Sequence, residues 1–508
     1  MTVPQLLEDR TAQQPDKVFL FFEDEEITYQ QLTNYMHAIA CGLIKMGVKK
    51  GDNVCVLIPN RPEFIYSFFG VMRAGAVAVP INTLLKGEEI TYIVNNCEAE
   101  AIIVAHDYLD LFRSISNDCP KVKHVISTTD DDDVISFDTL LTTPIDESLL
   151  PSITEEDDAS IIYTSGTTGR PKGVILTHGN YIADTRMMNE AVKMNPDDRF
   201  VCILPLFHVN AQVVTTLAPM YAGASMVLME KFSPKQFLPA LERYGATAFS
   251  GVPTVYAILN NQPDAEQYDL SKLRFCVCGG APMTVGVFEE FEKKYKAFIL
   301  EGYGLSEGTC ASSVNPLGGK RKVGSIGLPY EEQPMKIVDD NDNEVPPGTV
   351  GQIVVKGPNV MKGYYNNPEA TAATLKDGWL HTGDLGYVDD EGYFFIVGRK
   401  KEMIIRGGEN IYPKEIEEVV YRHPAIREAT VVGLPDEVWG EEVTAFIALR
   451  DQASLTEEDL IHYCKEHLAD YKCPRKVFFV DDLPKTATGK IQKNKVVQRF
   501  LAERGTGE

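Results

Sequence analysis

The sequence lacks the marks of an exported or membrane-spanning protein. Its first ten residues have no basic segment followed by an apolar core, so no signal peptide is predicted. The apolar stretch 64–80 is broken by Gly70, Arg73 and Gly75. It therefore predicts a buried helix followed by a strand, and no membrane span. Internal repeats and low-complexity tracts are also missing, which argues against solenoid and fibrous folds.

Cysteine pairs with metal-ligand spacing are missing as well. Ten cysteines are scattered along the chain, and of these only Cys276 and Cys278 lie close together, within an apparent strand. We interpret this pair as small buried side chains. The pattern predicts reduced thiols, no disulfide framework and a cytosolic compartment.

Positive charge is scarce. The 508 residues carry 49 Lys and Arg against 73 Asp and Glu, a formal charge of −24. This balance argues against a general nucleic-acid or anionic-membrane binder, so a polyanionic ligand needs local cations and backbone dipoles. Residues 471–508 are the exception, with nine Lys and Arg against four Asp and Glu.

A segment rich in glycine and hydroxyl groups lies between two apolar runs. It comprises Thr164, Ser165, Gly166, Thr167, Thr168, Gly169 and, after Arg-Pro, Lys172. Glycines let backbone N–H groups approach phosphate oxygens, and hydroxyls and a lysine add donors and charge. The spacing differs from the Walker pattern. We predict a phosphate-binding loop of another kind; the alternative is a flexible surface turn.

The alternation of apolar and amphipathic segments predicts an α/β fold, and this pattern gives way to expected antiparallel strands near residue 320. Short apolar runs alternate with amphipathic stretches over 15–305, which indicates α/β layers with largely parallel sheets. Antiparallel strands are expected after 320, including a hairpin turn at 389–392. A smaller unit with helices near 414–420 and after Thr456 follows, and we place the main domain boundary at 400/401. The expected strands and helices of the first region are 54–58, 101–104, 201–204, 225–228, 275–278 and 298–300, a helix with a capping box from Ser233 and Gln236, and a helix with Phe288, Phe291 and Tyr295 on one face.

Other segments offer groups suited to a nucleotide. Gly280 and Ala281 follow an expected strand and permit a flat ligand near the backbone, although a simple strand-to-helix turn is an equal alternative. Tyr303 and Glu307 follow the next strand end, where open α/β sheets bind ligands. An aromatic ring can stack on a base, and a carboxylate beside phosphates requires Mg²⁺. Alternatively, Tyr303 is a core residue and Glu307 is solvated.

Three isolated residues complete the set. Asp384 is suited to accept hydrogen bonds from a ribose diol, or is a turn residue. Arg399 ends the predicted hairpin and could equally be a surface residue. Lys490 lies in a Gly-containing loop near the C-terminus, where a lysine alone usually faces solvent.

In this order, these segments resemble the adenylate-forming superfamily of acyl-CoA synthetases, adenylation domains and beetle luciferases, over roughly 6–501. The resemblance implies a large N-terminal AMP-binding domain (1–400) of two α/β layered subdomains and a β-rich subdomain. A small mobile α+β lid (401–508) carrying Lys490 follows, so the fold is α+β overall. Within the superfamily, the chain looks like a free-standing acyl-CoA ligase.

The resemblance also implies site roles. The ATP and AMP residues are Thr164 to Gly169, Lys172, Gly280, Ala281, Gly302, Tyr303, Gly304, Ser306, Asp384 and Arg399, with the last two on the ribose hydroxyls. Glu307 is similar to the Mg²⁺ carboxylate, with Thr164 beside it. Lys490 resembles the lysine that bridges the acyl carboxylate and the α-phosphate, where a fixed cation stabilises the transition state.

By the same resemblance, Lys401 is the hinge whose rotation exchanges the lid faces between two half-reactions. The residues matched to CoA binding are Gly407, Gly408, Trp439, Tyr471 and Arg475. Some relatives have an arginine at the position of Cys473. Its absence leaves CoA docking to Arg475 and Lys476.

His208 follows Phe207 at a position that gates the acid pocket in this superfamily; a packed core histidine is the alternative. Amino-acid-activating relatives carry Asp there, which argues against an amino-acid substrate. The mainly apolar acyl pocket is expected from His208, Val209, Gln212, Val213 and Gly302, with 252–256.

The predicted function is ATP-dependent ligation of a carboxylic acid, foremost a medium- or long-chain fatty acid, to CoA, with Mg²⁺. Carrier-protein loading, and CoA ligation of an aryl, dicarboxylic or betaine-like acid, are alternatives. A luciferase-type oxygenase and a non-catalytic nucleotide-binding protein fit less well. Monomer and homodimer are both left open.

Overall fold

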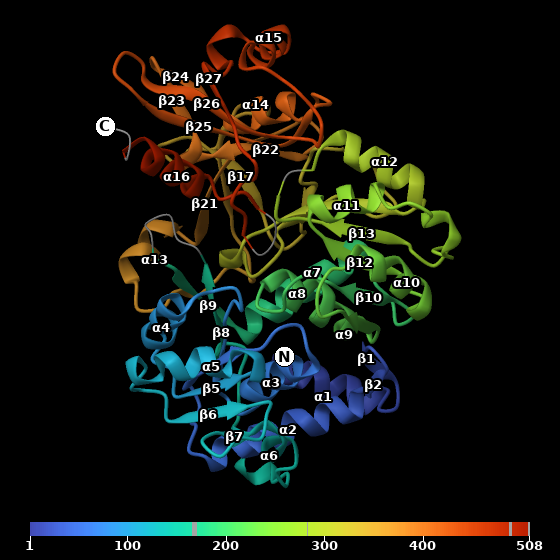
Figure 1. Ribbon diagram of the computed structural model, residues 1–508. Coiled ribbons are helices and arrows are strands. Elements are labelled where there is room, and N and C mark those ends of the chain that lie inside the picture. Colours follow the sequence, from blue (N-terminus) through green and yellow to red (C-terminus); the bar gives the residue numbers. More distant parts are fainter. Residues whose placement is uncertain (165–169, 282, 487–489, 506–508) are drawn as a thin grey trace.

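In the computed structural model, which describes residues 1–164, 170–281, 283–486 and 490–505, the strands form four sheets. Figure 1 shows the N-terminal sheet at the bottom, the second sheet at mid-height on the right, and the C-terminal part at the top. The mixture of layered sheets and helices confirms the α/β, overall α+β, fold class.

The first α/β layer is an eight-stranded sheet. In spatial order its strands are β19 (Gly363–Tyr364), β9 (Lys172–Thr177), β8 (Asp158–Thr164), β4 (Val77–Pro80), β3 (Asn53–Leu57), β5 (Ala101–Val104), β6 (His124–Ser127) and β7 (Ile135–Ser136). Strands β4 to β7 pair in parallel, whereas β8, β9 and β19 pair antiparallel. The helices of this part are α1 (Val3–Gln13), α2 (Tyr29–Lys45), α3 (Pro62–Arg73), α4 (Gly87–Asn96), α5 (His106–Ile115) and α6 (Phe137–Leu141).

The second layer is a nine-stranded sheet. Its order is β16 (Leu328–Pro329), β15 (Ser313–Val314), β14 (Phe298–Tyr303), β13 (Phe275–Cys278), β12 (Ala248–Gly251), β10 (Arg199–Cys202), β11 (Ser225–Leu228), β1 (Val18–Phe22) and β2 (Glu25–Thr28). The strands from β14 to β1 are parallel, so their carboxyl ends share one edge. Its helices are α7 (His178–Val192), α8 (Val209–Gln212), α9 (Ala218–Ala222), α10 (Pro234–Tyr244), α11 (Pro253–Asn260) and α12 (Val285–Tyr295).

Two smaller sheets follow. The first contains β17 (Met335–Val338), β18 (Gly351–Val355), β21 (Trp379–Val388), β20 (Leu375–Lys376) and β22 (Phe394–Arg399), with α13 (Pro368–Thr374) between β18 and β20 in the chain. The second contains β24 (Glu409–Ile411), β23 (Ile404–Arg406), β26 (Gly440–Leu449), β25 (Ile426–Asp436) and β27 (Lys476–Phe479), with α14 (Pro413–Val420), α15 (Glu457–His467) and α16 (Lys493–Gly505).

The apolar core divides between the same parts. One large cluster runs from Val3 to Phe394 and joins both α/β layers. Buried residues of the C-terminal sheet form separate clusters that begin at Ile404. The predicted boundary at 400/401 falls in the short turn between them, and the boundary stays a prediction.

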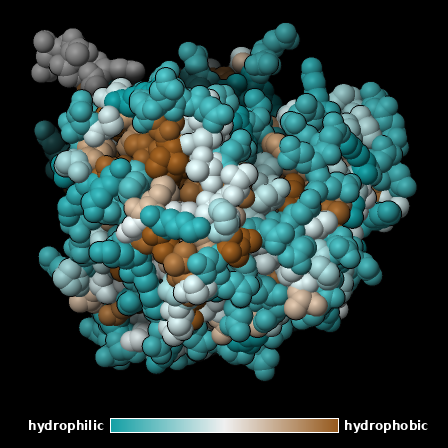
Figure 2. Space-filling model, turned by 90° about the horizontal axis from the view of Figure 1, so that it is seen from below, coloured by the Kyte–Doolittle hydropathy of each residue, from teal (hydrophilic) through white to brown (hydrophobic). Residues whose placement is uncertain are grey.

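The outer surface is mainly polar. Seen from below, the face over the eight-stranded sheet is mostly hydrophilic, with hydrophobic patches interrupted by polar residues (Figure 2). No helix among the described residues is long and apolar enough to cross a bilayer.

Most expected elements form close to their predicted bounds. Phe288, Phe291 and Tyr295 lie buried on one face of α12, and the stretch 64–80 forms α3 and β4. The ten cysteines are free and buried, Cys276 and Cys278 included. The capping box at Ser233 was predicted wrongly: α10 begins there, but the Ser233 side chain caps no N–H. Its main-chain carbonyl accepts from Gln236 N–H at 3.0 Å instead.

Candidate active site

Two antiparallel strands, β8 and β9, flank the predicted phosphate loop. Strand β8 ends at Thr164 and β9 begins at Lys172, and these two residues pair across the antiparallel ladder. Of the seven residues between them, five, Ser165 to Gly169, lie outside the described residues. Lys172 extends over the ring of Tyr364, with 5.0 Å between Nζ and the ring centroid. The hairpin thus brings a hydroxyl and an ammonium to one end of the sheet.

Glu307 lies close to this hairpin. It occupies a single helical turn, Ser306–Gly308, that follows β14. The phenol of Tyr364 donates to Glu307 Oε1 at 2.8 Å, so the ring beneath Lys172 also fixes the carboxylate. Sequence reasoning missed Tyr364. Its role arises from β19 pairing with β9, nearly 190 residues earlier in the chain, and no local pattern signals that pairing.

The loop that carries Glu307 is tightly fixed. A Cβ at Gly304 would lie 1.6 Å from the Cys310 carbonyl oxygen, so only glycine fits. The amide of Asn359 donates to the carbonyls of Gly308 and Ala311 at 3.0 Å each, and to Asp184 Oδ1 at 3.1 Å. Burial raises the pKa of Asp184 well above its ordinary value. These supporting residues were also missed, because they come from distant elements.

The predicted ribose residues form a bonded group. Asp384 on β21 lies opposite Arg399 on β22 in the ladder, and the two form an ion pair with 3.0 Å between Arg399 Nε and Asp384 Oδ1. The phenol of Tyr303 donates to Asp384 Oδ2 at 2.6 Å. Burial, followed by the Asp384 charge, raises the pKa of Tyr303 far above the physiological range. Tyr303 is therefore a buried residue that orients Asp384, in addition to its predicted place beside the adenine.

The other predicted nucleotide residues lie at the carboxyl edge of the nine-stranded sheet. Gly280 follows β13 with φ of +78°, which favours glycine, and Ala281 comes next. Gly302, at the end of β14, is backed by Val314 and Ser313 of β15. Ser306 opens the turn of Glu307. This edge is where an α/β sheet with crossover helices presents a ligand site.

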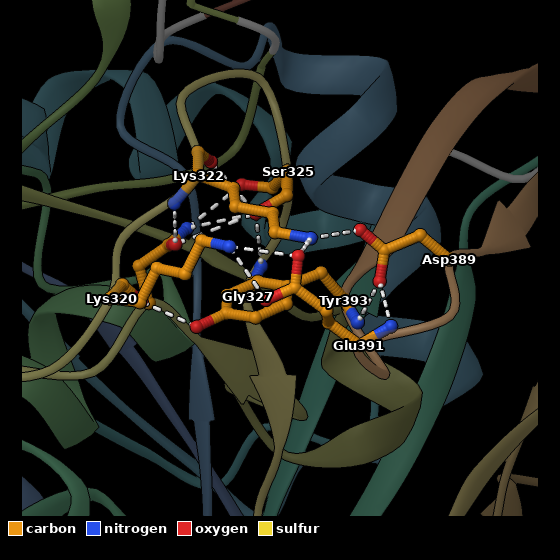
Figure 3. Close-up of polar contacts among 8 residues, drawn as sticks. Lys320, Lys322, Ser325, Gly327, Asp389, Glu391 and Tyr393 are labelled. Carbon is orange, nitrogen blue, oxygen red and sulfur yellow. Dashed lines mark hydrogen bonds and ion pairs between the residues drawn. The ribbon is translucent and has the colours of Figure 1, made fainter.

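A polar junction holds the β21–β22 hairpin against the nine-stranded sheet (Figure 3). Lys322 pairs with Asp389, and its Nζ lies 2.8 Å from Glu391 Oε1. Lys320 Nζ lies 2.6 Å from Glu391 Oε2, and Tyr393 donates to the Lys320 carbonyl. The junction is at the far end of the hairpin from Arg399. It therefore fixes the orientation of the strands that carry the ribose residues.

Lys490 reaches the same neighbourhood from the C-terminal sheet. Its carbonyl accepts from Thr486 N–H at 2.8 Å, and its N–H donates to Thr486 Oγ1 at 3.1 Å. Residues 487–489 lie outside the residues that the structure describes. Burial, followed by repulsion from Arg399, lowers the pKa of Lys490 to about 8, while Glu402 and Asp384 act in the opposite direction. The structure thus places Lys490 within electrostatic reach of Asp384 and Arg399, the predicted ribose residues, called the ribose pair below.

His208 lies at the start of α8, half-buried against Phe207, with 4.4 Å between the ring centroids. Burial lowers its pKa to about 4, and its buried Nε2 has no hydrogen-bond partner in the described structure. The ring is therefore neutral at physiological pH. A neutral ring suits a pocket wall more than a charge donor.

The expected acyl pocket continues along the following helix. Val209 and Val213 are buried, and 213–217 winds as a wide π-type turn, a feature frequent at functional sites. The Gln212 amide is engaged elsewhere: it donates to the Leu206 carbonyl at 2.9 Å and accepts from Tyr181 at 2.6 Å. Its polar atoms are therefore committed to the protein, and its place in the pocket stays a prediction.

The predicted CoA residues form two groups on the C-terminal part. Gly407 and Gly408 make the turn between β23 and β24, and Gly407 N–H donates to the Trp439 carbonyl at 2.9 Å. The guanidinium of Arg406 lies 4.4 Å from the Trp439 ring, which is 46% exposed. Figure 1 shows β23 and β24 at the top, on the far side from the phosphate hairpin.

The second group lies near β27. Tyr471, 38% exposed, is in a turn beside Lys472, and Arg475 pairs with Asp470. Lys401, the predicted hinge, lies in the turn Lys400–Glu402 that links the two small sheets. Like Lys490, Lys401 lies within electrostatic reach of Asp384 and Arg399.

The described oxygen donors fit a Mg²⁺ ion. No group of three or more His, Cys, Asp or Glu among the described residues forms a metal cluster. Mg²⁺ in nucleotide sites is bound by one or two carboxylates together with substrate phosphates, and does not need such a cluster. Glu307, held in place by Tyr364, and the Thr164 hydroxyl are suitable ligands.

Comparison with known proteins identifies the family. A family model named AMP-binding enzyme matches residues 7–365, and one named AMP-binding enzyme C-terminal domain matches 415–490. A long-chain-fatty-acid–CoA ligase of Bacillus subtilis is 36% identical over 98% of this chain and 94% of its own. An oxalate–CoA ligase of Arabidopsis thaliana is also 36% identical, over 98% and 99%.

A solved structure agrees over the whole length. ATP-bound MatB from Rhodopseudomonas palustris superposes with a TM-score of 0.91 at 31% identity, covering 98% of this chain and 99% of that one. The resemblance indicated by the sequence motifs is thus confirmed. The chain belongs to the AMP-binding enzymes, within the adenylate-forming superfamily.

Proposed function

We propose that the protein is an ATP-dependent acid–CoA ligase that forms an acyl-AMP and then an acyl-CoA. The observation that carries this proposal is the approach of Lys490 to Asp384 and Arg399 from a separate sheet. A cation brought to a nucleotide site by a second unit suits a reaction between two anions. The names of the relatives, which are CoA ligases, support the same activity.

In the first step, a carboxylate oxygen of the acid attacks the α-phosphorus of ATP, and pyrophosphate leaves. Asp384 and Arg399 hold the ribose, and the hairpin from Thr164 to Lys172 holds the phosphates. Glu307 and Thr164 would hold Mg²⁺, which neutralises phosphate charge when bound. Lys490 stabilises the charge that develops between the two anions.

In the second step, the CoA thiolate attacks the acyl carbon, and the carbon–oxygen bond to AMP breaks. Lys490 occupies the place near the acyl phosphate, so it must leave before the thiol can enter. Rotation at Lys401 would exchange it for the face that carries Gly407, Gly408 and Trp439. The exposure of Trp439 in the present orientation supports this exchange.

The segments around the expected acyl pocket favour an apolar acid. Residues 209–217 and 252–256 contain no charged side chain, and His208 is neutral. A second carboxylate buried there would find no cation on these segments, which is energetically costly. Relatives equally similar to this chain act on a long-chain acid and on oxalate, so identity alone does not choose. We propose a medium- or long-chain fatty acid.

A pyrophosphate-release screen across straight-chain, aromatic and dicarboxylic acids tests the proposal. We expect the highest kcat/KM with a straight-chain acid of medium or long chain, and thioester formation with free CoA. Turnover only with a holo carrier protein would support the loading alternative. Absence of acid-dependent pyrophosphate release with every acid would contradict the ligase assignment. A cytosolic location and a homodimer stay predictions, tested by fractionation and by light scattering.

A further inference from the structure

A lysine of the C-terminal part bonds to the strand that precedes the predicted hinge. Lys414, in the first turn of α14, donates from Nζ to the Ile396 carbonyl oxygen of β22 at 2.6 Å. Its side chain is only 16% exposed, and Glu418 Oε1, one turn later, is 3.6 Å away. Ile396 lies before Lys401 and Lys414 lies after it. Rotation at Lys401 must therefore separate the two atoms.

A carboxyl next to Gly302 lies within electrostatic reach of the same lysine. Glu301 is half-buried on β14, directly before Gly302, and accepts from Gly324 N–H at 3.0 Å. Burial raises its pKa to about 7; the charge of Lys414 acts in the opposite direction, and that of Glu418 adds to the rise. Lys414 is thus a counter-charge that the C-terminal part supplies to the main domain.

We propose that Lys414 is a positioning residue that holds the lid in the acid-activating orientation, by bonding the Ile396 carbonyl across the hinge. This inference rests on the proposed two-step function. The bond and the approach of Lys490 occur in the same orientation, so the contact stabilises only the first step. After rotation, Glu301 loses its nearby cation, which penalises its charged form.

Lys414→Met tests the inference, because methionine keeps the apolar stem and removes the donor and the charge. We expect acyl-AMP formation, measured as pyrophosphate release without CoA, to fall about tenfold, the size of one charge-assisted hydrogen bond. Thioester formation from supplied acyl-AMP should be unchanged or faster. Lys495→Met, an exposed lysine of the same part, is the matched control and should leave both rates unchanged.

Glu301→Gln provides a second measurement that does not depend on Lys414→Met folding. In the wild type, ionised Glu301 favours the orientation in which Lys414 lies within electrostatic reach. The ratio of first-step to second-step rates should therefore rise with pH through about 7. In Glu301→Gln this rise should vanish.

The outcomes separate this inference from the proposed function. Equal loss of both steps in Lys414→Met, or an unchanged ratio of steps, would overturn the positioning role while the ligase assignment stands. A rise of the ratio through about pH 7 that persists in Glu301→Gln would also overturn it. A wild-type protein that forms no acyl-AMP with any acid would instead overturn the proposed function.

Discussion

The two sides of the candidate site differ in how firmly their residues are held. On the main domain, Asp384 accepts a hydrogen bond from Tyr303 and pairs with Arg399, and its side chain is 7% exposed. Glu307 is fixed by Tyr364. On the C-terminal part, Trp439 and Tyr471 are 46% and 38% exposed. The main-domain residues of the candidate site are therefore held in place by the fold, whereas the predicted CoA residues of the C-terminal part are exposed to solvent.

The difference in how firmly the residues are held matches the proposed reaction, in which some residues serve one half-reaction and others serve both. Nucleotide-binding groups are needed throughout the reaction, so their hydrogen bonds are built into the fold. In the proposed mechanism the groups on the lid alternate, so their contacts with the main domain must be few and breakable. Lys490 and Lys414 are two residues of the C-terminal part that approach or contact the main domain in this orientation.

The largest expected effect comes from removing the cation that the lid contributes. Lys490→Ala should lower acyl-AMP formation by more than about 100-fold, because the variant lacks the fixed cation at the point where charge develops between carboxylate and phosphate. Thioester formation from supplied acyl-AMP should stay near the wild-type rate. Pyrophosphate release and thioester assays measure the two steps. Equal loss of both would show that Lys490 has no step-specific role.

The pH dependence sharpens this prediction. With a pKa of about 8, Lys490 is charged below that pH and loses its proton above it. The kcat/KM of acyl-AMP formation should therefore fall as pH rises through about 8. Lys490→Arg, which stays charged, should be less active but should not show this fall. The same fall in both proteins would assign the titration to another group.

Asp384→Asn tests the preorganised side. The change weakens the bonds from Arg399 and Tyr303 and the acceptor for the ribose, so KM for ATP should rise about tenfold. The melting temperature should also fall, since a partly buried ion pair is broken. Asp390→Asn, in the exposed hairpin turn, is the control. An unchanged KM for ATP would remove Asp384 from the nucleotide site.

Lys401→Pro tests the movement between the two sides. Proline restricts the backbone rotation at this position. Thioester formation should fall about tenfold, while acyl-AMP formation is retained. Lys400→Ala, a neighbour whose ion pair with Asp340 is exposed, should leave both steps unchanged. A normal thioester rate in the proline variant would place the hinge elsewhere.

Trp439→Ala should have the smallest effect and should change only the binding of CoA. Loss of the ring should raise KM for CoA about fivefold, the size of one stacking contact, with no change in acyl-AMP formation. Val438→Ala, at a neighbour that is 80% exposed, is the control. An effect on acyl-AMP formation would show that the tip of the lid contacts the main domain in the first step.

Local patterns predicted most of the secondary structure. The runs 101–104, 225–228 and 275–278 match β5, β11 and β13, and the Thr456 cap opens α15 as expected. These signals are short-range, so a single sequence contains them. The capping box at Ser233 failed because a backbone bond took the place of the side-chain bond.

Local sequence patterns could not predict the pairing of segments that lie far apart in the chain. The antiparallel addition of β19 to β9 brings Tyr364 beneath Lys172 and against Glu307, and the Asp184–Asn359 pair supports the same loop. None of Tyr364, Asp184 and Asn359 lies in a recognisable motif. Their positions depend on contacts between segments more than 170 residues apart in the chain.

The sequence by itself determined which groups are available: the phosphate segment, Asp384, Arg399, Glu307 and a distant Lys490 stand in the order that resembles the superfamily. Only the tertiary structure decided the orientation, in which Lys490 approaches the ribose pair while Trp439 faces outward. The physical reason is that residue types fix charge and hydrogen-bonding capacity, whereas the position of the lid depends on contacts such as Lys414 with Ile396. Those contacts exist only after both parts have folded.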